Sequence, residues 1–179
     1  MGIPTLIGSA HTASDAASID ITSGIDSTYD EYMFVFTDIN AATSATQFSF
    51  QVNAVGESDF DEYITSTWFH AAQYENNSWQ GLEYQTGNDQ AQGTGYQYLP
   101  IQMGAESDES GAGILHLYSP SSTTYVKHFH ARFNNYGQDD TTRATFIAGY
   151  FNLTAAIDEI SFKMSSGNFD GVIQMYGIA

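Results

Sequence analysis

The closing stretch "SSGNFDGVIQMYGIA" (165–179) decides the fold class. After a polar turn, Val172 and Tyr176 fall on one side of an extended chain, and Ile173 and Met175 fall on the other. This two-residue period is typical of a β-strand, because a helix repeats every 3.6 residues. Apolar residues occupy both sides, so we expect this strand to be hydrogen-bonded inside a sheet or covered by a neighbouring subunit.

The same alternation recurs through most of the chain. In "EYMFVFTDI" (31–39), the aromatic residues at 32, 34 and 36 share one face. In "TQFSFQVNA" (46–54), apolar residues alternate with polar ones, which predicts a strand with one packed and one solvated face. Further strands are expected in "STWFHAAQY", "GAGILHLYSP", "YVKHFHARFNNY", "ATFIAGYF" and "DEISFKM".

About eight to ten short strands joined by polar turns predict an all-β protein. We expect an antiparallel β-sandwich, jelly-roll-like, because a chain of this length suits two packed sheets. Residues 18–179 should form a single sandwich domain, preceded by an N-terminal arm at residues 1–17. The stretch "TAAIDEI" (154–160) fits either a helical turn or the approach to a strand.

The charge of the chain excludes some classes of partner. Its 179 residues include 21 acidic and 4 basic side chains, a formal net charge of −17. Proteins bind phosphate backbones through lysine and arginine, so we expect no nucleic-acid partner and no binding to an anionic membrane. The sequence has no apolar run long enough to span a bilayer. It has no cysteine either, which excludes disulfides and thiolate zinc sites.

One stretch breaks the strand pattern. Residues 74–98, "YENNSWQGLEYQTGNDQAQGTGYQY", are polar, glycine-rich and aromatic. A loop of this length inside a domain either hides a short hairpin or carries binding. Its aromatic side chains are candidate ligand contacts, because such rings stack on sugars or anchor protein interfaces; they are Trp79, Tyr84, Tyr96 and Tyr98. Local packing explains them equally well, and Trp68 is expected in the core.

The histidines and acidic clusters raise the question of a metal. His128 and His130 lie on one face of a strand, and His116 or His70 would have to supply a third ligand from elsewhere. The alternative, which we favour, is a polar strand face or histidines stacked near a subunit axis. Acidic turns can hold calcium, but solvated surface is the simpler interpretation of the clusters at 59–62, 106–109 and 139–140. We therefore expect no cofactor and leave calcium open.

Motifs of catalysis are missing from the sequence. It contains no G-x-S-x-G elbow, no glycine-rich phosphate loop and no H-E-x-x-H pair. A carboxylate pair for glycoside hydrolysis is defined by its separation in space, and no pair stands out along the chain. We expect a protein that is not an enzyme.

Several stretches together resemble a family of viral proteins. They are "SGIDSTYDEYMFVFTDIN", "FSFQVNAVGES", "PSSTTYVKHFHARFNNY" and "AGYFNLTAAIDEISFKMSSGNFDGVIQMYGI". They are similar to virion structural proteins of tailed bacteriophages of marine bacteria, including phages that infect cyanobacteria. Endings of the form "SGNF-DG-I-MYGI" also resemble distal domains of phage tail fibres. The resemblance covers the chain from about residue 18 onward, and its motifs are turns and strand ends.

The resemblance implies a β-sandwich built into a virus particle, commonly as a trimer. It would decorate the capsid or form part of a tail fibre or adsorption appendage, with other virion proteins as partners. Tail fibres usually carry an attachment domain and a shaft, whereas only about seventeen residues precede the first strand expected here. The alternative is a carbohydrate-binding module that recognises a host-surface glycan through the 74–98 loop. A hydrolase of the same fold is a third, weaker possibility.

Overall fold

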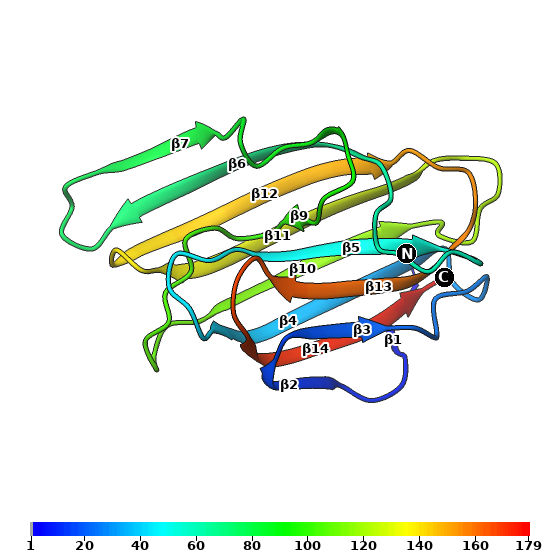
Figure 1. Ribbon diagram of the computed structural model, residues 1–179, viewed down its shortest axis with the longest axis horizontal. Coiled ribbons are helices and arrows are strands. Elements are labelled where there is room, and N and C mark those ends of the chain that lie inside the picture. Colours follow the sequence, from blue (N-terminus) through cyan, green and yellow to red (C-terminus); the bar gives the residue numbers. More distant parts are fainter. Residues whose placement is uncertain (1) are drawn as a thin grey trace.

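The computed structural model describes residues 2–179, which fold into two antiparallel sheets packed face to face (Figure 1). This confirms the expectation of an all-β antiparallel sandwich. Residues 2–179 contain no helix, so none is present there that could cross a membrane.

The two sheets differ in size. The larger has ten strands, with the order β1-β14-β4-β10-β11-β12-β6-β7, while β2 pairs with β14 and β8 with β6. Its strands are β1 (Thr5–Leu6), β2 (His11–Ala16), β4 (Glu31–Ala41), β6 (Ile64–Tyr74), β7 (Gln80–Tyr84), β8 (Ala91–Gly93), β10 (Gly111–Tyr118), β11 (Lys127–Gly137), β12 (Thr141–Phe151) and β14 (Phe169–Ile178). The smaller sheet has the order β3-β13-β5-β9 and comprises β3 (Ser18–Ile21), β13 (Ile157–Met164), β5 (Phe48–Ala54) and β9 (Gln97–Tyr98).

The chain forms more strands than the eight to ten expected. Beyond the eight segments named from the sequence, six further strands of two to six residues are present, namely β1, β2, β3, β7, β8 and β9. A segment this short shows no clear alternation of apolar and polar residues. It is a strand because it hydrogen-bonds to a longer neighbouring strand. Of the two interpretations of "TAAIDEI", the structure shows the approach to a strand, because β13 begins at Ile157.

The closing strand β14 lies inside the larger sheet, between β4 and the N-terminal strands (Figure 1). Ile173 and Met175 are buried in the core, and Val172 and Tyr176 lie on the outer face. Strands β1 and β2 come from the segment expected to form an arm, whose first residue lies outside the described residues. The chain's own beginning therefore pairs with its end.

Phenylalanine side chains fill the space between the sheets. Phe36 of β4 lies at the centre, with its ring 5.3 Å from that of Phe162, 5.5 Å from Phe48 and 5.8 Å from Phe133 (centroid distances). All four side chains are almost fully buried. Trp68 is also buried, as expected, and its indole N–H donates to a backbone carbonyl.

The expectation of a solvated face on the strand 46–54 is wrong. Every residue of β5 is buried, including Ser49 and Gln51, whose side chains point away from the core. The Gln51 amide donates to the carbonyls of Glu62 (3.0 Å) and Thr94 (3.1 Å), which belong to loops that fold over this sheet. A polar strand face can be covered in this way when its side chains hydrogen-bond to the covering loops.

Candidate functional site

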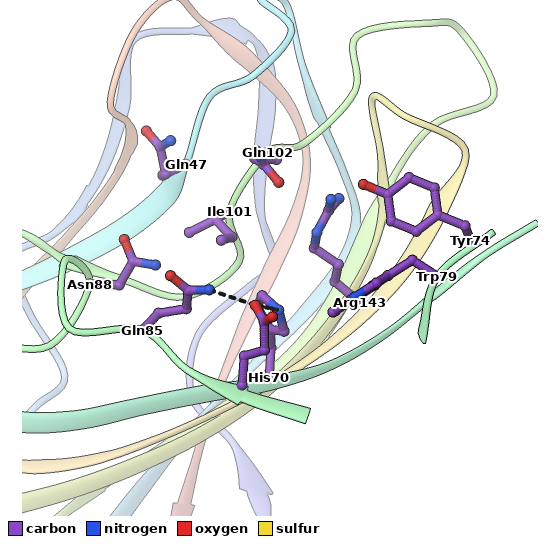
Figure 2. A pocket seen from close by; sticks show the side chains of 10 residues that line it. Gln47, His70, Tyr74, Trp79, Gln85, Asn88, Ile101, Gln102 and Arg143 are labelled. Carbon is purple, nitrogen blue, oxygen red and sulfur yellow. Dashed lines mark hydrogen bonds and ion pairs between the residues drawn. The ribbon is translucent and has the colours of Figure 1, made fainter. Parts of the chain in front are cut away.

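The larger sheet extends past the smaller one at the end formed by β6, β7 and β12 (Figure 1). A cleft lies at this end. Its volume is about 530 Å³, within the range of small-molecule sites. Ten residues line it: Gln47, His70, Tyr74, Trp79, Glu83, Gln85, Asn88, Ile101, Gln102 and Arg143. Figure 2 shows the aromatic pair and the arginine on one side, three amides on the other, and His70 at the floor.

Arg143 of β12 is the fixed cation of the cleft. Arg143 is only 4% exposed, and two of its amino groups donate to the Asp139 carboxylate at 2.9 and 2.8 Å. The Tyr74 hydroxyl donates to the same carboxylate at 2.7 Å. Arg143, helped by Tyr74, holds the pKa of Asp139 well below its usual range. A guanidinium has five N–H donors, and these hydrogen bonds to Asp139 use two of them.

A glycine makes room for this arginine. A Cβ atom at Gly137, at the end of β11, would overlap the Nη1 atom of Arg143. Gly137 therefore permits the guanidinium to lie flat against the β11–β12 turn, where it meets Asp139.

His70 forms the floor of the cleft and is 4% exposed. Its Nε2 atom lies 3.8 Å from the Glu83 carboxylate, and its Nδ1 atom has no hydrogen-bond partner within residues 2–179. Burial and the nearby Arg143 lower its pKa, so the imidazole is neutral at pH 7. The hydroxyl of Thr145, opposite His70 in the neighbouring strand, also lacks a partner among these residues. Buried polar groups without partners are rare, and a bound water, a ligand or strain can account for them.

An indole and several amides complete the lining. Trp79 is 36% exposed and meets Tyr74 edge to face, with ring centroids 6.0 Å apart. A Cβ atom at Gly81 would lie 2.7 Å from the indole, so Gly81 lets Trp79 lie close over β7. The Gln85 amide donates to the Glu83 carboxylate at 3.0 Å (Figure 2). The cleft thus combines an aromatic surface with both donors and acceptors.

The four aromatic residues proposed as ligand contacts do not form one surface. Trp79 lines the cleft. Tyr84 pairs with Phe69 on the opposite face of β7, and its hydroxyl donates to Asp89 at 2.5 Å. Their separation follows from the hairpin formed by β6 and β7. The 74–98 stretch therefore contains no hairpin of its own: it supplies only the turn and the second strand of this one, and its other short strands pair elsewhere.

The other two candidates lie against the smaller sheet. Tyr96 covers its outer side, with the Lys163 ammonium 3.9 Å from the ring centroid and its own hydroxyl donating to Ser161 at 3.1 Å. Tyr98 belongs to β9, is partly buried and packs against the core. Both are held by contacts within the domain.

The sequence patterns did not single out Arg143 or Glu83, and they suggested His70 only as a metal ligand. A signal for Arg143 was available. It is one of four basic residues, and the alternation of "TTRATFIAGYF" places it on the same face as the buried Ile147. Glu83 resembled any other exposed acid.

The outer face of the larger sheet is a second candidate surface. One cross-strand row contains Ile114, Arg132, Phe146, Phe69 and Tyr84, on five adjacent strands. The rings of Phe146 and Phe69 stack with centroids 5.1 Å apart, and the Arg132 guanidinium lies 5.1 Å from the Phe146 centroid. Phe69 is 37% exposed and Tyr84 is 52% exposed, so this row presents aromatic surface to solvent.

The histidines of the next rows lie on the same outer face. The rings of His116 and His130 stack with centroids 4.5 Å apart, and His130 Nδ1 is 2.9 Å from the Tyr118 hydroxyl. His116 pairs with Glu31. His70 lies on the inner face and cannot join them. Within residues 2–179, no three metal-ligating side chains come together.

No family model matches the chain, and no curated protein matches it. Function is therefore inferred from the residues of this chain and their arrangement.

Proposed function

We propose that this protein is a non-enzymatic structural component of a bacteriophage particle, built from three copies of the chain. It would lie on the particle surface, as a capsid decoration protein or as part of a tail fibre or adsorption appendage. Two features support the proposal. They are the resemblance of the sequence to phage virion proteins and the β-sandwich fold.

The outer face of the larger sheet carries this proposal. Over its five central strands (β4, β10, β11, β12 and β6), the outward side chains include two carboxylates, Glu31 and Asp38, and one guanidinium, Arg132. The rest are aliphatic, aromatic, imidazole, hydroxyl or amide groups. In a chain of net charge −17, acidic groups are therefore concentrated elsewhere, and this is where copies can approach without repulsion.

The area of this face fits a stable interface. The five central strands and the neighbouring β7 make a face six strands wide. With strands ~4.8 Å apart and a rise of ~3.4 Å per residue, a stretch of about eight residues on each gives an area of roughly 800 Å². Each partner in a standard-size protein interface buries about that area. Exposed aromatic groups such as Phe69 and Tyr84 are the residue types that contribute most to such contacts.

The mechanism of such a component is assembly. Phenylalanine packing closes the sandwich, the outer sheet face joins the copies, and the acidic loops keep the assembly dispersed in water. Loops at the ends of the sandwich remain free to contact other virion proteins or the host surface.

Oligomeric state tests this proposal most directly. Sedimentation of the full chain at micromolar concentration should give a trimer, and Phe146→Lys should give a monomer because it places a charge inside the interface. Tyr125→Lys is the matched control, since Tyr125 is 72% exposed in a loop outside the sheet face. A monomeric wild type would contradict the trimer. Antibody labelling of phage particles that leaves both head and tail unlabelled would contradict the virion role.

A second candidate function is a carbohydrate-binding module that recognises host-surface glycan. The cleft favours it, because an exposed indole beside amide and carboxylate groups is suited to the apolar face and the hydroxyls of a sugar. A glycan array probed with the full chain tests it. The absence of any bound glycan would rule this candidate out and leave the structural role standing.

A further inference from the structure

We infer that the cleft between the sheets binds a neutral glycan, with Trp79 under the sugar ring and Glu83 and Arg143 holding its hydroxyls. This inference rests on the carbohydrate-binding candidate and assigns its site and ligand class. The site differs from the platform that the sequence suggested, because Tyr84, Tyr96 and Tyr98 lie outside it.

The hydrogen-bonding groups of the cleft suit hydroxyls. A hydroxyl donates one hydrogen bond and accepts others, so a site for several of them needs both kinds of group close together. Arg143 supplies N–H donors whose direction Asp139 fixes, and the Glu83 carboxylate supplies acceptors. The side-chain amides offer both kinds of group; they are Gln47, Gln85, Asn88 and Gln102.

The charge of the lining favours a neutral ligand. The Arg143 cation is already paired with Asp139, and the His70 imidazole is uncharged at pH 7 because burial lowers its pKa. The negative charge of the Glu83 carboxylate is therefore not balanced, and the lining of the cleft has a net negative charge. An anionic sugar would enter against this charge and against the field of a chain with net charge −17. A neutral sugar meets neither penalty.

The aromatic group has the right position for stacking. Trp79 lies at the mouth of the cleft, supported from below by Gly81 and from the side by Tyr74. A partly exposed, supported indole offers rigid apolar area at low entropic cost. The cavity of about 530 Å³ is within the usual range of ~300–1,000 Å³ for small-molecule sites.

Tryptophan fluorescence can report on this site. The chain contains two tryptophans, of which Trp68 is buried in the core and Trp79 is 36% exposed in the cleft. Titration of the full chain with neutral hexasaccharides of glucose, mannose and N-acetylglucosamine should shift the emission of Trp79 with at least one of them. Hexagalacturonic acid and a heparin hexasaccharide should produce no shift at the same concentrations.

Point variants of cleft residues test whether the sugar binds in the cleft. Glu83→Gln keeps the shape of the side chain and should weaken binding of the responding sugar by about tenfold or more, as should Trp79→Ala in calorimetry. Gly81→Ala should weaken binding as well, because the methyl group displaces the indole. Tyr84→Ala is the matched control, on the same strand but the opposite face, and should change affinity less than about twofold.

Three results would overturn the inference. A response to the acidic sugars alone would show that the ligand class is wrong, and so would no response to any neutral sugar. Equal affinity of wild type and Glu83→Gln, with a loss in Tyr84→Ala, would place a glycan site on the outer face instead. The virion proposal fails separately, through oligomeric state and particle labelling, so the two failures are distinguishable. Equal melting temperatures of the variants exclude misfolding as the cause.

Discussion

The two faces of one sheet end carry opposite chemistry. Strands β6, β7 and β12 point Phe69, Tyr84 and Phe146 outward, and the same strands point His70, Glu83 and Arg143 into the cleft. Residues adjacent in sequence, such as Glu83 and Tyr84, therefore serve different surfaces. The outer face is aromatic and almost uncharged. The inner face holds polar groups at fixed positions, which is what a small ligand requires.

The inner face itself changes along the sheet. Beneath the smaller sheet it is lined by phenylalanines, and beyond that sheet it is lined by polar residues. Burying a polar group is costly unless hydrogen bonds replace its contact with water, as those to Asp139 do for the nearly buried Arg143. Because the smaller sheet does not cover the larger one at the end formed by β6, β7 and β12, the inner face there can line a cleft.

The largest expected effect is on the free energy of unfolding, and it distinguishes aromatic residues buried between the sheets from those on the outer face. Phe36→Ala should lower the free energy of unfolding by about 3–5 kcal/mol, because it leaves a cavity among three other phenylalanine rings. Phe146→Ala, the same change on the outer face, should cost about 1 kcal/mol or less in the monomer. Urea denaturation measures both. Equal losses would show that the outer face is packed within the protomer.

A smaller effect concerns the cation of the cleft. Arg143→Gln should lower the free energy of unfolding at pH 6 by about 1–2 kcal/mol, because Asp139 loses its charged partner. Since the folded pKa of Asp139 is depressed, this contribution is complete above the unfolded pKa of ~3.9 and is lost as the pH falls. Denaturation at pH 6 and pH 2.5 should show the difference shrinking. Arg132→Gln on the outer face is the control and should show no such change.

A weaker pH effect tests the buried imidazole. Burial and Arg143 lower the folded pKa of His70, so between that value and the unfolded value of ~6.5 the unfolded chain binds more protons. Stability should therefore be complete above about pH 6.5 and fall below it, by about 1 kcal/mol or less at pH 5.5. In His70→Gln this part of the decline should disappear. An unchanged pH profile would show that His70 is accessible enough to titrate normally.

The smallest effect is expected at the exposed edge of the sheet. Leu82→Ser on β7 should change the free energy of unfolding by about 0.5 kcal/mol or less, because Leu82 is 70% exposed on the outer face. Thermal unfolding of wild type and variant measures it. A loss of several degrees in melting temperature would mean that another part of the molecule covers this edge.

The sequence predicted the strands better than it predicted the site. The alternation put Tyr32, Phe34 and Phe36 on one face of a strand, and the structure buries that face of β4. It also put Ile173 and Met175 on one side of the closing strand, but only the structure shows that this side, of two apolar ones, faces the core. It failed for β5, whose polar face is covered by loops. It also grouped four aromatic residues of one loop, although the structure directs them to three different surfaces.

The sequence by itself determined that this chain forms strands and which side of most of them is apolar, because alternation is a local property of a few consecutive residues. Only the tertiary structure decided that His70, Glu83, Trp79 and Arg143 meet in one cleft. These residues come from β6, β7, the turn between them and β12, and the register of strands far apart in the chain brings them together. The extent of the smaller sheet, which leaves that end of the larger sheet open, is likewise set by long-range pairing.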